Sequence, residues 1–149
     1  ALASGTFIEG WAVHAEQLVV DAVAASAPAG VDIEALRMQQ LKMRLRSTIN
    51  AILDVRVHSR GMSRDEAMRL MTVRGHQEES EAAGKWRRAL LTSAQLSTYF
   101  VGYLEVSMVA AARPAGTPPR DWHDAMLAHG SPAPRHLPAL LADFSEASR

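Results

Sequence analysis

The sequence predicts an all-α protein, built as a multi-helix bundle, and three observations lead to this expectation. Apolar residues recur at steps of three and four along most of the chain, which is the period of a helix with one buried face. No segment alternates apolar and polar residues as a half-buried strand does, and no Asn-Gly hairpin turn is present. The 149 residues are 48% hydrophobic with nine glycines and seven prolines, which suits one folded domain and excludes a collagen-like or disordered chain.

The first half of the chain predicts two long helices. An apolar stripe at helical spacing covers residues 6–25, and the Ser, Ala, Pro and Gly residues of 26–30 favour a loop after it. Asp32 has a side chain suited to cap a second helix, which we expect to run to about residue 59. Gly61 lies where that helix would end, because glycine readily adopts the left-handed conformation of a helix stop.

The middle of the chain predicts two shorter helices. Ser63 and Glu66 have the spacing of a capping box, in which each side chain binds a free backbone amide of the first turn. A short helix is expected from there to about Val73, ending at Gly75. Residues 78–91 carry acidic side chains first and basic ones late, an order that complements the helix dipole.

Three further helices are expected in the last third. Thr92 or Ser93 can cap a long apolar helix that continues to about Ala112. A loop of prolines and glycine follows, and then a short helix over residues 120–129 and a final one over about 134–145. Together the helices are expected to form one domain over residues 1–149.

Composition excludes several classes of function. Sixteen Lys and Arg residues balance 16 Asp and Glu residues, so no basic face for nucleic acid is expected. Cysteine is absent, which excludes disulfides, thiolate nucleophiles and cysteine zinc sites, and favours a reducing compartment such as the cytoplasm. The N-terminus does not have the pattern of a signal peptide, and no run of about 18 apolar residues predicts a membrane span.

Glu9 is the first residue that suggests chemistry, because it lies in an otherwise apolar helical turn. A carboxylate there is costly unless it is paired, hydrogen-bonded or bound to a metal. Glu16 lies two turns further on, about 10 Å away along roughly the same face. Spacing alone favours two solvated carboxylates over a binding site.

Four segments resemble one known family in the same order. Residues 7–16, with the sequence Phe-Ile-Glu-Gly-Trp-Ala-Val-His-Ala-Glu, resemble the signature of the domain-of-unknown-function 885 family, which are predicted zincin-like metallopeptidases. Residues 54–67, residues 95–102 and the Trp-His-Asp region of 122–131 are similar to later motifs of that family. The resemblance implies the C-terminal part of a zincin-like fold of the gluzincin type.

The resemblance also implies a metal. In such proteins a His-Glu-x-x-His helix supplies two zinc ligands and the general base, and a Glu on a later helix supplies the third ligand. By this resemblance Glu9 is the third zinc ligand. The complete parent protein would use Zn²⁺ to activate water and hydrolyse a peptide-like substrate.

The chain departs from the family most clearly in its histidines. Its six histidines, at positions 14, 58, 76, 123, 129 and 136, do not form a His-Glu-x-x-His pattern. We therefore expect a C-terminal portion of a larger protein that binds no zinc by itself, or a natural short relative that has lost the metal. The expected partner is the upstream part of the same protein, or a second copy of the chain.

Two further residues are candidates for catalysis. His58 could bind the substrate or the tetrahedral oxyanion, with Asp54 one turn earlier orienting its ring. The alternative is a histidine that interacts with the dipole at a helix C-terminus. Tyr99 could donate to the oxyanion from a long apolar helix, or could be a core tyrosine whose hydroxyl reaches the surface.

Three residues are candidates for binding substrate. Arg87 and Arg88 resemble a family arginine and could bind a substrate carboxylate. Gln95 is expected one turn before Tyr99 on the same helix face, where it could support the phenol. His123 is expected to be an ordinary position of an amphipathic helix.

Two classes of function remain open from the sequence. A subunit or part of a zinc hydrolase predicts that Glu9, His58 and Tyr99 converge on one cleft. A non-enzymatic helical module that binds a partner or itself predicts that these residues lie apart. Both predict an exposed apolar surface that another part of a protein would cover.

Overall fold

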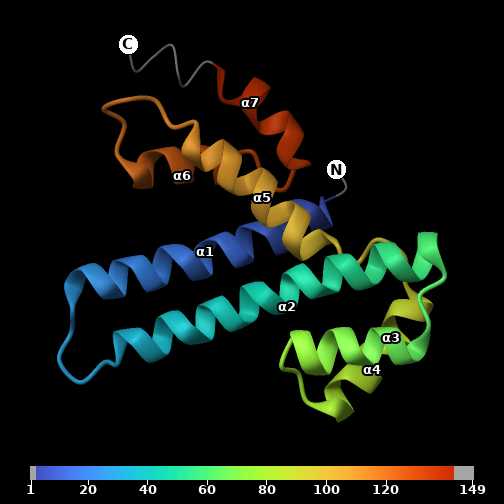
Figure 1. Ribbon diagram of the computed structural model, residues 1–149. Helices are drawn as coiled ribbons and strands as arrows, with labels where there is room; N and C mark the ends of the chain where they lie inside the picture. Colours follow the sequence, from blue (N-terminus) through green and yellow to red (C-terminus); the bar gives the residue numbers. More distant parts are fainter. Residues whose placement is uncertain (1–2, 143–149) are drawn as a thin grey trace.

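The computed structural model describes residues 3–142, and all regular structure within that range is helical (Figure 1). This confirms the expected all-α multi-helix bundle. The elements are α1 (Gly5–Ser26), α2 (Ile33–Arg60), α3 (Arg64–Arg69), the π-helical turn η1 (Leu70–Arg74), α4 (Glu79–Leu91), α5 (Thr98–Ala111), α6 (Pro119–Ala128), the 3-10 turn η2 (Pro134–His136) and α7 (Leu137–Leu140).

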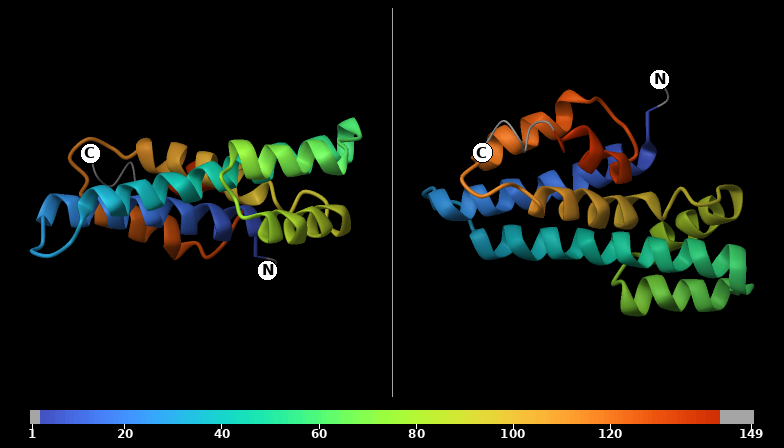
Figure 2. Two further views of the ribbon diagram at one scale, coloured as in Figure 1. Left: turned by 60° about the horizontal axis from the view of Figure 1, so that its bottom comes forward. Right: turned by 90° about the horizontal axis from the view of Figure 1, so that it is seen from above.

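The long helices α1 and α2 form a hairpin to which the shorter helices attach (Figure 1). α5 packs along α1 and also touches α2. α3 and α4 lie against the C-terminal half of α2, whereas α6 and α7 lie on the other side of α5 (Figure 2). The molecule is therefore elongated, with a group of short helices on each side of the central helices.

The predicted helix ends around α2 and α3 are confirmed. The Asp32 carboxylate accepts a hydrogen bond from the Ala35 amide at 2.9 Å, and Gly61 ends α2 in the left-handed region with φ of 59°. Ser63 and Glu66 form the expected capping box, in which the Ser63 amide donates to Glu66 Oε2 at 2.9 Å. The hydrogen bonds from Ser63 lower the pKa of Glu66.

The segment after α3 differs from the expected continuous helix. It widens into the π-helical turn η1, which ends at the buried Gly75. A Cβ at Gly75 would lie 2.5 Å from Ile49 Cδ1 and 2.6 Å from the carbonyl oxygen of Met71. The fixed carbonyl of Met71 within η1, with Ile49 of α2 beside it, therefore favours glycine here.

The expected start of the long apolar helix at Thr92 or Ser93 is wrong, because α5 begins at Thr98. Ala94 has a left-handed backbone with φ of 64°, which interrupts any helix through this segment. Its amide donates to the carboxylate of Asp54 at 3.2 Å. A long-range contact with α2 thus turns residues 92–97 into a connection, which we call the α4–α5 turn.

The last expected helix is interrupted within the described residues. The predicted range 134–145 contains η2 and then α7, and its residues 143–145 lie outside the described part of the chain. Pro134 begins η2, where a helix needs no backbone N–H, whereas Pro138 lacks the N–H that a continuous helix would bond to the carbonyl of Pro134. Pro138 therefore favours division of this segment into two short turns.

The buried side chains form two separate clusters. The first joins α1, α5, α6 and α7 and contains the aromatic rings of Phe7 and Trp122. The second joins α2, α3, η1 and α4, is built from aliphatic side chains, methionine and alanine, and includes Leu96 of the α4–α5 turn. The hydrogen bonds of Asp54 to the α4–α5 turn connect the second cluster to the start of α5.

Many large apolar side chains stay outside both clusters. They are exposed by 37% or more on the described surface, and several lie along α2, among them Met38, Leu41, Leu45 and Val55. Within residues 3–142, every helix is too short or too polar to span a membrane.

Candidate functional site

Glu9 is positioned by the close crossing of two helices. A Cβ on Gly10 would overlap the backbone of Gly102, and a Cβ on Gly102 would lie 2.9 Å from Cα of Gly10. Only two glycines allow α1 and α5 to approach this closely, and we call this contact the α1–α5 crossing. Glu9 is therefore held beside the crossing, where its side chain is half-buried.

Tyr99 approaches the same crossing from α5. It lies in the first turn of α5, three residues before Gly102, and is half-buried. Glu9 and Tyr99 thus lie within one turn of the point where the two helices touch. No hydrogen bond links either side chain to another residue of the described range, so the polar atoms of both are available for other partners.

His58 is engaged at the end of α4. Its Nε2 lies 2.9 Å from the carbonyl oxygen of Ala89 and 2.8 Å from that of Thr92, so this nitrogen donates its proton to them. These carbonyls belong to the last turn of α4, which leaves them without helical partners. The imidazole therefore caps the C-terminus of a neighbouring helix, a role related to the dipole interaction considered from the sequence.

Asp54 bonds to the α4–α5 turn and makes no hydrogen bond to His58. Its Oδ1 is 3.6 Å from His58 Nε2, too long for a hydrogen bond. The carboxylate, which is only 2% exposed, accepts hydrogen bonds from the Ala94 amide at 3.2 Å, the Ser97 amide at 2.9 Å and the Ser97 hydroxyl at 2.7 Å. Asp54 is the anchor of the α4–α5 turn, and its position in the helix sequence gave no indication of this.

Of the three substrate-binding candidates, Arg88 and Gln95 bond to each other at this turn, and Arg87 lies on α4. Arg88 Nε donates to Gln95 Oε1 at 3.4 Å, so these two side chains are brought together. Gln95 lies in the turn and not on α5, and the expected shared helix face with Tyr99 is therefore wrong. Arg87 is exposed on α4 and makes no ion pair within residues 3–142.

His58 and Arg88 bond to the α4–α5 turn, Gln95 lies within it, and Tyr99 follows it directly. Glu9 lies on α1 beside the crossing, near the start of α5. The hydrogen bonds of Asp54 and the glycine contact are the two features that produce this arrangement. Convergence of these side chains on one cleft stays a prediction.

Two histidines that the sequence does not connect, His14 and His123, lie side by side in the structure. His14 and His123 have ring centroids 5.6 Å apart, and Trp11 lies within 5.8 Å of both rings. His14 Nδ1 is 3.1 Å from the Ser107 hydroxyl, whereas its Nε2 is buried without a hydrogen-bond partner in the described structure. His14 follows Phe7 and Trp11 at helical spacing, and this is the pattern that could have placed it against α5 and α6.

Burial and proximity change the proton affinity of this pair. Burial first, and then the charge of His123, lower the pKa of His14. Burial and the charge of Arg113 lower the pKa of His123, while Asp124 opposes them. Both imidazoles therefore favour the neutral form in the folded protein.

Lys85 is a second group whose chemistry the sequence did not reveal. Its ammonium donates to Gln77 Oε1 at 2.8 Å. Burial, together with the charges of Arg46 and Arg88, lowers the pKa of Lys85 to about 8. An amine with such a pKa can exchange protons near neutral pH, but it lies on α4, away from the α1–α5 crossing.

The His, Asp and Glu side chains of the described residues do not form a complete metal site. Within residues 3–142, no three His, Asp or Glu side chains lie close enough together to hold a metal ion. Glu9 offers one carboxylate, whereas a zinc site of this kind needs three protein ligands.

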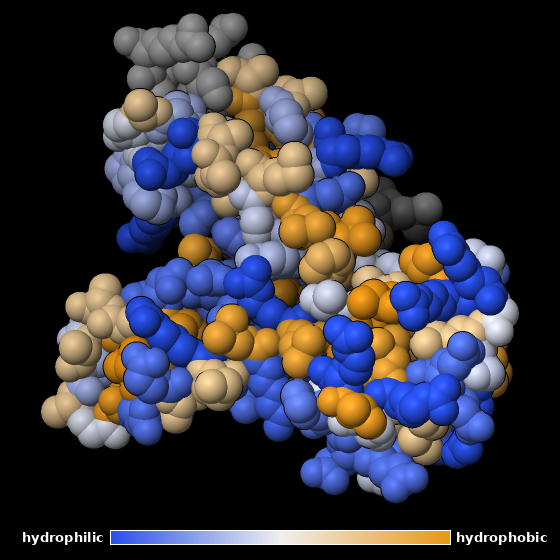
Figure 3. Space-filling view, in the orientation of Figure 1, coloured by the Kyte–Doolittle hydropathy of each residue, from blue (hydrophilic) through white to orange (hydrophobic). Residues whose placement is uncertain are grey.

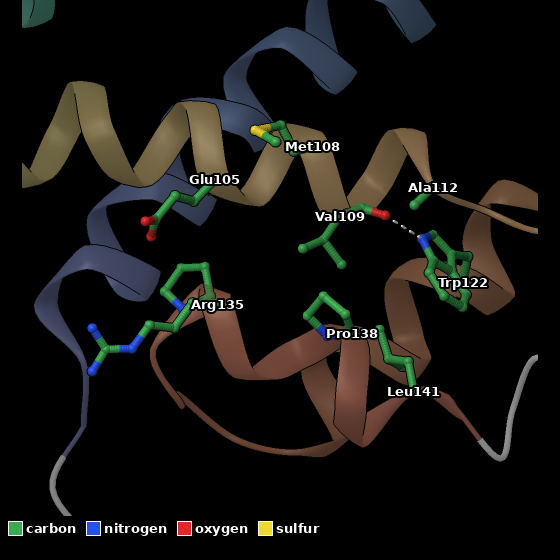
Figure 4. Close-up of a pocket in the computed structure, with 9 residues that line it drawn as sticks. Glu105, Met108, Val109, Ala112, Trp122, Arg135, Pro138 and Leu141 are labelled. Atoms are coloured by element: carbon green, nitrogen blue, oxygen red, sulfur yellow. Dashed lines mark hydrogen bonds between the residues drawn. The ribbon is translucent and has the colours of Figure 1, made fainter.

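A pocket of about 530 Å³ lies between α5, α6 and α7 (Figure 4). Its wall is mostly apolar, and the Trp122 indole donates to the carbonyl oxygen of Val109 at 3.0 Å beside it. Glu105 and Arg135 stand at one end (Figure 4). The predicted site residues are not among those that line this pocket.

Comparison with known proteins gives two matches. A family model described as "Bacterial protein of unknown function (DUF885)" matches residues 1–141. The chain is also similar to a solved structure described as "a putative lipoprotein of unknown function from Shewanella oneidensis", with 30% identity and a TM-score of 0.81. The match covers 93% of this chain and 25% of that one, so this chain spans about a quarter of its length. No curated protein matches.

Proposed function

Because the chain belongs to the DUF885 family of bacterial proteins, we propose that it is the helical part of a zinc-dependent, peptidase-like hydrolase that supplies Glu9 as one zinc ligand. The observation that carries this proposal is the α1–α5 crossing, which holds Glu9 and Tyr99 within one turn of the same point. A carboxylate and a phenol so placed suit a site that binds a cation and a developing oxyanion.

The remaining zinc ligands would come from outside these 149 residues. One carboxylate is too few ligands for such an ion, and the resemblance implies that the other two lie on a His-Glu-x-x-His helix. Bound zinc would supply Lewis acidity and an activated water. The part played by this chain is to fix one carboxylate on a rigid crossing of two helices.

The side chains available to a substrate are Tyr99 and Arg87. The Tyr99 phenol can donate to a carbonyl oxygen, and the guanidinium of Arg87 can bind a peptide-like substrate through a carboxylate. Arg88 and Gln95 would first have to give up their mutual hydrogen bond. For His58, Nε2 holds the carbonyls of α4, so contact with substrate would fall to Nδ1.

The test compares two glutamates of α1 in the longest natural product of the gene. Glu9→Gln should lower the zinc content by at least about ten-fold and abolish hydrolysis of peptide-like amides, because the amide is a poorer ligand than the carboxylate. Glu16→Gln, two turns away and exposed, should change neither. Zinc content by elemental mass spectrometry is the readout, and full zinc retention in Glu9→Gln would remove Glu9 from the site.

The second candidate is a helical module without a metal that binds a partner helix or a second copy of itself. The exposed apolar side chains of α2 favour it. It predicts that the longest gene product contains no stoichiometric zinc, and the measurement above therefore separates the two candidates.

The expected location also belongs to this proposal. Absence of cysteine favours the cytoplasm, whereas the similar Shewanella oneidensis chain is described as a candidate lipoprotein. Cell fractionation with an antibody against this chain decides between the two, and recovery with the envelope would overturn the cytoplasmic location.

A further inference from the structure

One face of α2 carries an uncovered apolar seam. Its residues follow one another at steps of three, four, three, four and three, and we call them the α2 stripe: Met38, Leu41, Leu45, Thr48, Ile52 and Val55. Leu41 and Val55 are each 54% exposed and Met38 is 67% exposed. Figure 3 shows this face of α2, with apolar side chains between hydrophilic ones along the helix.

The spacing is that of a coiled-coil seam. Met38, Leu45 and Ile52 are seven residues apart, and Leu41, Thr48 and Val55 follow each of them by three, so they occupy the a and d positions of three heptads. Such a narrow seam, in contrast to a broad apolar face, is the pattern of a helix that pairs with another helix.

The packed residues of α2 point in other directions. Gln40 and Arg44 bind Gln17 of α1, and Ile49 and Leu53 belong to the cluster with α3 and α4. Met38, Leu41, Leu45 and Val55 of the α2 stripe therefore stay exposed after the contacts within residues 3–142 have been made, whereas Thr48 and Ile52 are half-buried. A hollow of about 420 Å³ beside Thr48, Ile52 and Phe100 offers room for side chains of a partner.

The flanks of the stripe determine the charge of that partner. The e and g positions beside the seam include Arg37, Lys42, Arg44 and Arg56 together with Ile49, Ala51 and His58, with no acidic residue among them, and Arg44 already binds Gln17 of α1. Arg37 and Lys42 are exposed and make no ion pair in the described structure. Residues at e and g choose partners by charge, so these positions call for Asp or Glu on the facing helix. A second copy of α2 would bring basic side chains such as Arg37 and Lys42 against each other, which disfavours self-pairing.

We propose that the α2 stripe binds an amphipathic helix whose apolar heptad seam is bordered by acidic residues and which belongs to another part of the same protein. The inference rests on the proposed function, in which this chain works within a larger protein. The chain covers 25% of the similar Shewanella oneidensis chain, which leaves ample further polypeptide in such a protein to supply the helix.

The test uses the 149-residue chain and two designed helical peptides with the same leucine and isoleucine seam. One peptide carries Glu at every e and g position and the other carries Lys. The Glu peptide should bind at least about ten-fold more tightly in fluorescence anisotropy, and its affinity should fall with added salt. Leu45→Glu with Ile52→Glu should abolish binding, whereas Val73→Glu with Leu90→Glu, also exposed but outside the stripe, should not.

Four results would overturn the proposal: no binding of the Glu peptide, equal binding of both peptides, a dimer of the chain that Leu45→Glu with Ile52→Glu dissolves, or tighter binding to vesicles of anionic lipid than to the Glu peptide. Far-UV circular dichroism verifies that each variant is folded. The zinc measurement on Glu9→Gln is independent of this result, so failure of one proposal is distinguishable from failure of the other.

Discussion

The α1–α5 crossing and the α2 stripe contain similar apolar side chains but differ in what covers them. Near the crossing, Phe7 is 2% exposed and Val106 is fully buried, because Gly10 and Gly102 let the two backbones touch. On the α2 stripe, Leu41 is 54% exposed, since no helix of the described range lies over it. Helical periodicity in both regions predicts a face that needs covering, but of the two regions only the crossing is covered by residues that the structure describes.

This difference in coverage predicts that the α1–α5 crossing stabilises the fold and that the α2 stripe binds a partner. Residues at the crossing are expected to determine whether the chain folds and where Glu9 and Tyr99 lie. Residues of the α2 stripe are expected to matter little for folding of the isolated chain and much for assembly. Three substitutions test this contrast.

Gly102→Val should have the largest effect. Its side chain would overlap the carbonyl oxygen of Thr6 and the backbone of Gly10, so α1 and α5 would have to separate. We expect a loss of about 3 kcal/mol or more in the free energy of unfolding, measured by urea denaturation. As a matched control, Gly84→Ala in α4 meets only the Arg87 guanidinium at 4.0 Å and should stabilise the chain by about 0.5–1 kcal/mol. Unchanged stability of Gly102→Val would refute the close crossing.

His14→Gln should have an intermediate effect that depends on pH. The folded-state pKa of His14 lies below the ordinary value of 6.5, so the unfolded chain binds more protons as pH falls through that value. The stabilising contribution of the neutral His14 to the free energy of unfolding is therefore complete above about pH 6.5. It declines as the pH falls toward the lower pKa of the folded state. Replacing His14 should reduce the slope of the free energy of unfolding against pH by at most about 1.4 kcal/mol per pH unit, which corresponds to one proton.

The control for that slope is His129→Gln, because His129 is exposed at the end of α6. Thermal unfolding of both variants and the parent chain across the acidic range gives the comparison. An identical slope in His14→Gln and the parent chain would show that the buried imidazole is not the group that titrates.

Leu41→Gln should have the smallest effect on stability. Its side chain lies on the α2 stripe and is 54% exposed, so the free energy of unfolding should change by no more than about 0.5 kcal/mol. Leu53→Ala, on the same helix but fully buried, should cost about 2–5 kcal/mol. Similar losses in the two variants would mean that the stripe is already covered in the isolated chain.

The hydrogen bonds of His58 and Asp54 could not be predicted from the sequence. The sequence identified Glu9, His58 and Tyr99 by resemblance, but it did not indicate that His58 caps α4 or that Asp54 holds the α4–α5 turn. Both roles depend on hydrogen bonds between residues 31 to 43 positions apart in the chain. Helical spacing carries no information about such partners, and Asp54 lies at a position that resembles any other of its helix.

The sequence by itself determined the helical class, the caps at Asp32 and Ser63 and the end of α2 at Gly61, because each depends on contacts within one turn of backbone. Only the tertiary structure decided that α5 begins at Thr98, that His14 meets His123 and that the α2 stripe stays open. These features arise when distant helices compete for the same backbone amides and apolar faces, and the geometry of their packing decides which contact forms.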